Sequence, residues 1–403
     1  MKTSVAMATY NGADYLIEQL DSLRDQTMPI DEVIICDDGS KDNTVQMIRD
    51  YIKENALGER WTLIENEVNL GYANNFHKAL NLATGDYIFF SDQDDIWMTN
   101  KIEEMTKVLN ENPKIQLLCS DYEPFSSAES APTVPKKIME KMTGDGSVEQ
   151  IVLNSKNVHI ASLGCDMCIR KTFRDRIEPF WIKGWAHDDY VWKMAQCADG
   201  CYTYHKPLIK RRLHANNVSM RKMHQKDKRV KFLRELAEAY TGMLNYAKSI
   251  PLSKKKLHFI ERSVKATILR ADLVEHCKLF NSAQYMVEHC KADEHIVVQA
   301  SAGTGKTTVM IDRIMYLLHT NPNLRLAELF MITFTNDAAQ QMSNRLQDAF
   351  LTRYSLTKQK CYMRWVEEQS QMHISTIHSF AYYMLKQLGI GESFTKGLSI
   401  RTF

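Results

Sequence analysis

Acidic residues gather at two places in the first hundred residues. CDDGSKDNT (36–44) contains Asp37 and Asp38, and SDQDDIW (91–97) contains Asp92, Asp94 and Asp95. Carboxylates sharing one cleft repel one another, and a divalent cation would relieve that repulsion. Hard oxygen ligands of this kind suit Mg²⁺ or Mn²⁺ bridging a diphosphate. The alternative for each string taken alone is a solvated Asp-Gly turn that merely ends a strand.

The elements around these residues predict how they are positioned. Short apolar runs at 4–8, 32–38, 61–66 and 86–92 predict strands, and stretches of helical period at 15–26, 44–55 and 73–83 predict helices. This alternation is typical of a mostly parallel sheet covered by helices on both faces, which binds ligands beyond the carboxyl ends of its strands. TYNG (9–12), which holds Tyr10 and Asn11, also falls at such an end.

Composition and length indicate a soluble globular protein with several domains. The chain has 403 residues, 44% of them hydrophobic, and 51 Lys plus Arg offset 49 Asp plus Glu. These values exclude disordered, coiled-coil and disulfide-scaffold classes, and the net charge of +2 gives no global case for nucleic-acid binding. The nine cysteines are scattered, and neither a signal peptide nor a membrane-spanning run is apparent. We therefore expect a cytoplasmic protein with reduced thiols.

The remaining chain divides into further segments. FSSAESAPTVPKKIMEKMTGDG (125–146) predicts a flexible loop or lid, 159–170 is strand-like, and 228 to about 280 is helical with a turn at 250–253. We expect a first domain at 1–225, a helical extension or linker at 226–280, and a different domain at 281–403.

Taken together, several strings resemble family 2 glycosyltransferases, and SDQDDIW resembles their rhamnosyltransferase-like members. The strings are TYNG, CDDGSKDNT, NLGYANNF (69–76), ATGDYIFFSDQDDIW, GCDMCIRK, HDDYVW and RRLHANNVS. The resemblance covers about residues 2–220 and extends less clearly to 280. It implies a GT-A fold that uses a nucleotide-sugar donor, inverts the anomeric carbon, and acts on a glycan or lipid-linked acceptor, with dTDP-rhamnose or a UDP-sugar as candidate donors.

The resemblance also implies roles for single residues. Asp38 matches the aspartate that contacts the nucleotide base, with Tyr10, Asn11 and Asp37 beside it. Asp92 and Asp94 match the two ends of the D-x-D motif: Asp92 would face the ribose or metal, and Asp94 would ligate the metal.

Asp188, in HDDYVW, matches the expected catalytic base, and Asp189 is the fallback. A single inverting displacement needs such a carboxylate opposite the leaving diphosphate, while a metal and basic groups stabilise the charge on that leaving group.

The basic run LIKRRLHANN adds candidate phosphate and metal contacts. Lys210, Arg211 and Arg212 could face the donor phosphates, and His214 could face them or the metal. The alternative is a solvated basic surface, or one that faces the inner side of a membrane as a peripheral protein does.

Two cysteine pairs superficially resemble a zinc site. Cys165 and Cys168 precede Cys197 and Cys201. If GCDMCIR is a strand, Cys165 and Cys168 point to opposite faces and cannot chelate together, so the zinc interpretation is the weaker one. Zinc binding by the pairs His276/Cys277 and His289/Cys290 is also the weaker interpretation, because these pairs repeat a whole pentapeptide, VEHCK, and not a ligand spacing.

A second chemistry begins near residue 296. ASAGTGKT (300–307) follows an apolar run expected to be a strand and opens an expected helix, as a phosphate-binding loop does. Backbone amides and the helix N-terminus would hold phosphates, Lys306 would reach the β and γ oxygens, and Thr307 would offer its hydroxyl to Mg²⁺.

This region resembles UvrD-like superfamily 1 helicases through the loop and three flanking strings: FNSAQ (280–284), ITFTNDAAQQM (332–342) and STIHSF (375–380). The resemblance implies adenine contact by Gln284 and places Thr335, Asn336 and His378 toward single-stranded DNA. The residues expected to bind ATP are Gln284, Ala300, Gly303, Gly305, Lys306 and Thr307.

Helicase activity is not expected, because ATP hydrolysis needs an acidic pair after a buried strand and no such pair follows His378. Glu367 and Glu368 precede STIHSF and lack a leading apolar strand. We therefore expect the tail to be the opening fragment of a helicase domain. Two alternatives stay open: an ATP-dependent nucleic-acid protein with a passenger N-terminal domain, and a fusion or assembly product, for which the repeated VEHCK (274–278 and 287–291) would be a recombination scar.

Overall fold

The computed structural model describes residues 1–126, 133–134, 136–160, 162–214, 226–276, 282–290, 297–299 and 305–388. The chain forms two compact units, Met1–Ile268 and Leu269–Phe403.

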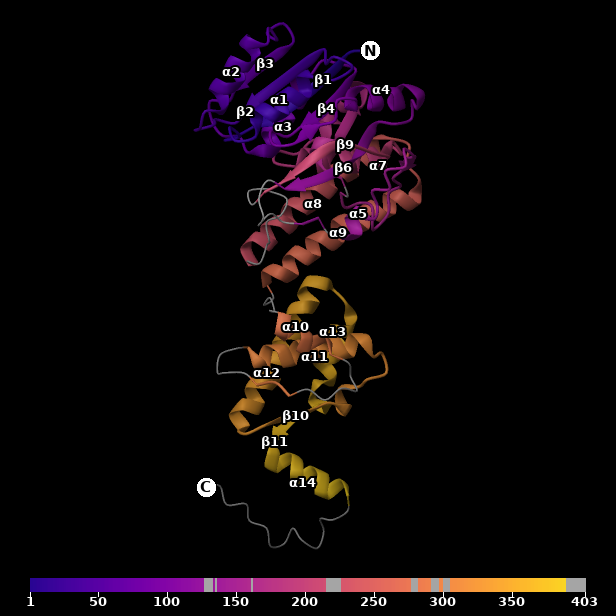
Figure 1. The fold of residues 1–403 in the computed structure, drawn as a ribbon. Coiled ribbons are helices and arrows are strands. Elements are labelled where there is room, and N and C mark those ends of the chain that lie inside the picture. Colours follow the sequence, from indigo (N-terminus) through magenta and orange to yellow (C-terminus); the bar gives the residue numbers. More distant parts are fainter. Residues whose placement is uncertain are drawn as a thin grey trace. The chain divides into compact units, whose positions relative to one another are not determined.

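The N-terminal unit is built on one mixed sheet whose first half is parallel (Figure 1). The parallel neighbours are β3 (Trp61–Glu65), β2 (Glu32–Asp37), β1 (Thr3–Thr9) and β4 (Tyr87–Ser91). The sheet continues through antiparallel β8 (Met167–Arg170) to β6 (Leu117–Ser126), β9 (Cys201–Leu213) and the short β5 (Ile96–Trp97), and β7 (Val148–Gln150) pairs with β9. The four strands predicted before residue 100 are confirmed.

Helices cover both faces of this sheet, as the alternation predicts. Ala6, Ile34 and Phe90 face one apolar core, which is completed by α3 (Tyr72–Leu82), α6 (Lys171–Ile177) and α7 (His187–Cys197). Val5, Ile35 and Phe89, one residue away in each strand, face the other core. That second core is completed by α1 (Leu16–Arg24), α2 (Thr44–Glu54) and α4 (Lys101–Glu111).

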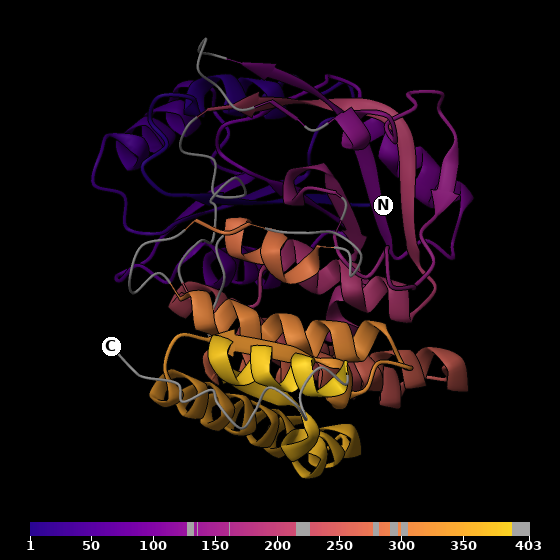
Figure 2. The same cartoon turned by 90° about the horizontal axis from the view of Figure 1, so that it is seen from below.

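Beyond β4, long strands carry the sheet to the later site residues. β9 lies beside β6 and runs parallel to it over most of its length (Figures 1 and 2). The register of the pair shifts near Asp121. A short helix, α5 (Lys136–Met139), lies within the predicted lid, of which residues 127–132 and 135 fall outside the described residues. Because β1, β2, β4, β6 and β9 all run the same way, their carboxyl ends meet at one edge.

The helical extension packs on the first core. It consists of α8 (Lys226–Ser249) and α9 (Lys254–His276), separated by the predicted turn. Tyr240, Met243, Tyr246 and Ile260 are buried members of the core that contains α7. This part of the extension is therefore integral to the N-terminal unit.

The C-terminal unit has a core of its own, centred on Leu346, Phe350 and Trp365. Its strands β10 (Phe330–Thr333) and β11 (His373–Thr376) pair in parallel. Its helices are α10 (Ser282–His289), α11 (Lys306–Thr320), α12 (Asn336–Thr357), α13 (Lys360–Glu368) and α14 (Ile377–Gln387).

The prediction of a strand before the phosphate loop is wrong for the residues of that segment that the structure describes. Residues 297–299 adopt no regular structure and pair with neither β10 nor β11, and Val297 is 91% exposed. An apolar run without a ladder partner gains no hydrogen bonds from an extended conformation.

Within the described parts of the chain, none of the helices combines the length and the apolar character needed to cross a bilayer.

Replacing Met243 by Ala should lower the free energy of unfolding of the N-terminal unit by about 2–4 kcal/mol, because loss of a fully buried side chain would leave a cavity. Urea denaturation measures this change. Lys248→Ala, on an exposed position of the same helix, is the control and should change little. Equal small effects would show that α8 does not belong to this core.

Candidate functional site

Four carboxylates crowd together where β4 ends and α7 begins. Asp92, Asp94 and Asp95 follow β4 directly, and Asp188 lies in the first turn of α7. Burial raises the pKa of Asp92 well above its usual value, and the charges of Asp94, Asp95 and Asp188 raise it further. Burial and Asp94 likewise raise the pKa of Asp95 to about 6. Among the described residues, neither Asp92 nor Asp188 forms a salt bridge.

Part of this cluster has the spacing of a cation site. Asp92, Asp95 and Cys165 each place a ligand atom within 4.8 Å of the others. Burial raises the pKa of the Cys165 thiol far above its usual value, so the thiol stays protonated and is a poor ligand. The carboxylates therefore suit a hard divalent cation, which would also relieve their repulsion.

The ligand set expected from the sequence is distributed differently. Asp94 Oδ2 lies 2.7 Å from His214 Nε2, so two of the expected ligands are in contact with each other. Asp95, which the sequence placed only in the acidic string, and Cys165, which it considered only for zinc, lie with Asp92 instead. The premise that Cys165 lies on a strand is wrong, because Gly164–Asp166 form a turn of 3₁₀ helix and the strand begins only at Met167.

Basic side chains anchor the loop that carries the cluster. Arg212 donates its backbone N–H to Asp95 Oδ1 (2.9 Å) and its Nε to the carbonyl of Asp94 (2.9 Å), and it pairs with Glu18. Its guanidinium also stacks over the rings of Tyr15 and Phe125, at 4.7 and 4.6 Å. Arg212 thus holds the loop in place, and a contact with donor phosphates stays a prediction.

Two further cations complete the surroundings. Lys101 is fully buried, donates from Nζ to the carbonyl of Cys165 (2.6 Å), and has its pKa lowered to about 8 by burial. Arg211 lies over the ring of Tyr122, and its charge acts to lower the pKa of Asp92 and Asp95. Lys210, by contrast, is exposed.

The two neighbouring aspartates of HDDYVW have opposite environments. Burial and the adjacent Asp189 raise the pKa of Asp188 to about 6, and its Oδ1 accepts a hydrogen bond from the Asp189 amide. Asp189 instead pairs with the buried Lys193 and accepts from Trp185 Nε1 at 2.7 Å. Asp188 is therefore the carboxylate suited to take up a proton near neutral pH.

His187 precedes this pair and was not predicted to matter. Its ring stacks on Phe76, with centroids 3.7 Å apart, and meets Phe90 edge-on. A Cβ at Gly164 would overlap it. Burial lowers the pKa of His187 to about 3, so a neutral ring fixes the start of α7.

The carboxylates after β2 do not join the cluster. Asp37 is buried and accepts hydrogen bonds from the Thr9 hydroxyl (2.8 Å) and from Gly39 and Ser40. Asp38 is also buried and accepts from the amides of Leu70 (2.7 Å) and Gly71 (2.8 Å). The expected repulsion between these two residues and the later aspartates is therefore wrong: both hold loops at the sheet edge.

The TYNG loop lies against the acidic loop. Tyr10 is 46% exposed, and its backbone N–H and carbonyl both pair with the side chain of Gln93, at 2.8 and 3.1 Å. Asn11 has a left-handed φ of 48° and accepts from the Lys41 amide at 2.7 Å. The ring of Tyr10 is therefore available to a ligand at this edge.

The C-terminal unit positions part of the predicted phosphate loop. Gly305 precedes α11 with a left-handed φ of 84°, and a Cβ there would lie 3.2 Å from Gln284 Nε2. Lys306 and Thr307 open α11, whereas Ala300 and Gly303 lie outside the described residues.

The residues expected to face DNA lie at helix starts. Thr335 caps α12, accepting from the Ala338 amide at 3.2 Å, Asn336 follows it, and His378 is exposed in the first turn of α14. Glu367 and Glu368 end α13, so they do not follow a strand.

The cysteine pairs do not assemble a zinc site among the described residues. Cys165, Cys168, Cys197 and Cys201 are all buried as free thiols, and the only group with metal-binding spacing there is the one around Asp92. Cys277, of the repeated pentapeptide, lies outside the described residues.

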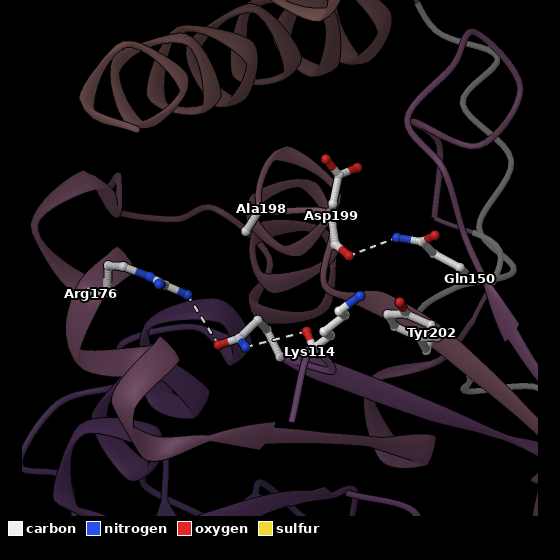
Figure 3. A pocket seen from close by; sticks show the side chains of 7 residues that line it. Lys114, Gln150, Arg176, Ala198, Asp199 and Tyr202 are labelled. Carbon is white, nitrogen blue, oxygen red and sulfur yellow. Dashed lines mark hydrogen bonds between the residues drawn. The ribbon is translucent and has the colours of Figure 1, made fainter. Parts of the chain in front are cut away.

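A pocket of about 420 Å³ opens at the opposite edge of the sheet, at the amino ends of β6 and β9 (Figure 3). Lys114, Arg176, Asp199 and Tyr202 line it, with Arg176 donating to Gln116 at 3.0 Å. It contains none of the clustered carboxylates, so it is not the candidate site.

Comparisons with known proteins match this architecture. Residues 4–176 match the model of Glycosyl transferase family 2, and residues 280–402 match the UvrD/REP helicase N-terminal domain. The structure of S. aureus TarS 1-349 in complex with UDP-GlcNAc aligns over 92% of both chains with a TM-score of 0.52 and 17% identity. At this identity the likeness shows the fold alone, which is the GT-A type that the sequence predicted.

Curated relatives are also glycosyltransferases. TuaG of Bacillus subtilis, named for teichuronic acid biosynthesis, is 31% identical over 163 residues, covering 39% of this chain and 61% of TuaG. The Escherichia coli protein WfaP, named as a UDP-Glc:alpha-D-GlcNAc-diphosphoundecaprenol beta-1,3-glucosyltransferase, is 36% identical over 119 residues, covering 30% of this chain and 45% of WfaP. The chain thus spans less than two thirds of these relatives. Within the N-terminal unit, residues 4–176 are therefore similar to family 2 glycosyltransferases.

Substitutions at the two adjacent aspartates should change stability in opposite directions. Because the pKa of Asp188 is raised, the folded state loses stability as pH rises from about 4 through 6. Asp188→Asn should therefore raise the free energy of unfolding at pH 7.5 by about 1–2 kcal/mol and change it little at pH 4.

Asp189→Asn is the matched comparison and should lower stability by about 3 kcal/mol, because it leaves Lys193 buried without its partner. Denaturation at both pH values measures the two effects. Destabilisation by Asp188→Asn at pH 7.5 would show that a favourable partner holds that carboxylate.

Proposed function

We propose that the family 2 glycosyltransferase domain of this chain transfers a sugar from a nucleotide-sugar donor to a glycan or lipid-linked acceptor, with inversion and with a divalent cation. The observation that supports this proposal is that a cation-compatible set of acids after β4 lies near a carboxylate from another element, Asp188 at the start of α7, whose pKa is raised to about 6. Inverting transfer needs carboxylates in two roles: one set binds the cation, and one carboxylate acts as the general base.

The donor would lie at the carboxyl edge of β1, β2 and β4. Tyr10 offers an exposed ring for the nucleotide base, with Asn11, Asp37 and Asp38 fixing the loops around it. Asp92, Asp94 and Asp95 would hold Mn²⁺ or Mg²⁺, with His214 beside Asp94. The bound cation would neutralise charge on the leaving diphosphate.

Asp188 would act as the general base. Its carboxylate accepts the proton of the acceptor hydroxyl while that oxygen attacks the anomeric carbon. Asp189 stays paired with Lys193 and Trp185, so it orients the turn without exchanging protons. The neutral ring of His187 keeps the start of α7 in place.

Two kinds of nucleotide sugar are candidate donors. The SDQDDIW string favours dTDP-rhamnose by resemblance, whereas TarS 1-349 was solved with UDP-GlcNAc and WfaP is named for UDP-Glc. A UDP-sugar and dTDP-rhamnose are therefore the first donors to test. The diphosphoundecaprenol in the name of WfaP supports testing a lipid-linked acceptor.

A second candidate function concerns the C-terminal unit. The approach of Gln284 to Gly305, at the start of α11, favours adenine nucleotide binding there. Unwinding is not proposed, because no acidic pair follows a strand in the described residues of this unit.

Donor hydrolysis by the purified full chain should require Mn²⁺ or Mg²⁺ and release a nucleoside diphosphate from one of a panel of UDP-, dTDP- and GDP-sugars. Asp94→Ala should lower the rate at least about 10²-fold, whereas Lys306→Ala in the tail should leave it unchanged. Turnover of ATP alone, abolished by Lys306→Ala, would overturn the transferase proposal.

The pH dependence of transfer should report Asp188. Because the base must be ionised, kcat/KM should fall on the acid side with an apparent pKa of about 6 and level off above it. Asp188→Asn should lower kcat by about 10²–10⁴-fold and remove this limb. If kcat/KM of that variant still falls on the acid side, another group causes the fall. Asp189→Asn then tests whether that group is Asp189.

A further inference from the structure

Gln93 stands between two aspartates of the acidic loop, and its side chain turns back toward β1. Oε1 accepts from the Tyr10 amide at 2.8 Å, and Nε2 donates to the Tyr10 carbonyl at 3.1 Å. One side-chain amide thus pairs with both backbone groups of one residue, as a neighbouring strand would.

This clasp continues the sheet beyond its last backbone pair. The ladder between β1 and β4 ends at Met7 and Ser91. Past that point the two chain segments carry different parts of the candidate site: the loop with Tyr10 and Asn11, and the loop with the acidic cluster. The Gln93 side chain fixes the spacing between them.

Gly12 shows how close this packing is. A Cβ at position 12 would overlap the amide group of Gln93, while Gly12 is not among the glycines with positive φ. A side chain at position 12 would therefore displace the Gln93 amide group from Tyr10, whereas the backbone conformation of Gly12 does not itself call for glycine.

We propose that Gln93 is a positioning residue that couples nucleotide binding to cation binding. This role rests on the proposed function, in which the nucleotide lies on the Tyr10 loop and the cation on the Asp92 loop. A diphosphate joins the two ligands only if the loops keep a fixed separation, and the clasp holds that separation before either ligand arrives.

The contacts of the side chain favour a positioning role. Both polar atoms of Gln93 already pair with the backbone of Tyr10, and this pairing turns the amide group toward β1. Its effect should therefore appear in the linkage between the two ligands and not in the affinity for either one alone.

The test is calorimetric titration of the full chain with UDP, dTDP and GDP, each with and without MnCl₂. The coupling factor is the ratio of the diphosphate Kd without and with Mn²⁺. Gln93→Ala should reduce this factor about tenfold and change the metal-free Kd little. Gln46→Ala, whose exposed side chain donates to Asp50 within α2, is the control and should leave the factor unchanged.

Gly12→Ala adds an independent arm, because its methyl group should displace Gln93. Alone it should reproduce the loss of coupling, and in the Gln93→Ala background it should have no further effect. A coupling factor in Gln93→Ala equal to that of the wild type, even with a lower Tm, would overturn the proposal, since the clasp would then serve stability only.

Failure of the proposed function would look different. If the wild type binds none of the three diphosphates, the nucleotide proposal fails. Thermal unfolding of the wild type, the two single variants and the double variant then tests whether the clasp itself exists. Non-additive decreases in Tm for Gly12→Ala and Gln93→Ala support the clasp, and additive decreases overturn it.

Discussion

Mutual repulsion among Asp92, Asp94, Asp95 and Asp188 is the constraint on which the arrangement of the N-terminal unit depends. No attraction between these groups holds them together, so their proximity is imposed by the sheet edge and by the start of α7. The charge of Arg211 acts to lower the pKa of Asp92, but burial and like charges still raise it. A site in this condition favours any ligand that brings positive charge.

Other charged residues stabilise the loops around the repelling carboxylates. Arg212 is held by Glu18, by the carbonyl of Asp94 and by two aromatic rings, so the acidic loop cannot move away from β9. Asp37 and Asp38 are committed to backbone amides of neighbouring loops. Asp37 and Asp38 therefore stabilise the loops of this edge, whereas neither Asp92 nor Asp188 forms a salt bridge among the described residues.

The sequence predicted the elements well because their cause is local. Alternation of buried residues in β1, β2 and β4 follows directly from strand geometry, and Asp residues at strand ends must gather at one edge of a parallel sheet. The sequence could not show that Cys165 lies near Asp92, because a 3₁₀ turn replaces the expected strand at Cys165. The clasp of Tyr10 by Gln93 was equally hidden, since it joins residues 83 positions apart.

One missed feature was nevertheless readable. Asp189 and Lys193 are four residues apart on one helix, the spacing at which opposite charges pair. That spacing alone distinguishes the two neighbouring aspartates: Asp189 has a lysine four residues later that pairs with it, and Asp188 does not. The division between Asp188 and Asp189 is thus encoded in α7 itself, and it lies wholly within the unit Met1–Ile268, which has its own core. The assignment of transfer chemistry to this unit therefore does not depend on what the C-terminal unit binds.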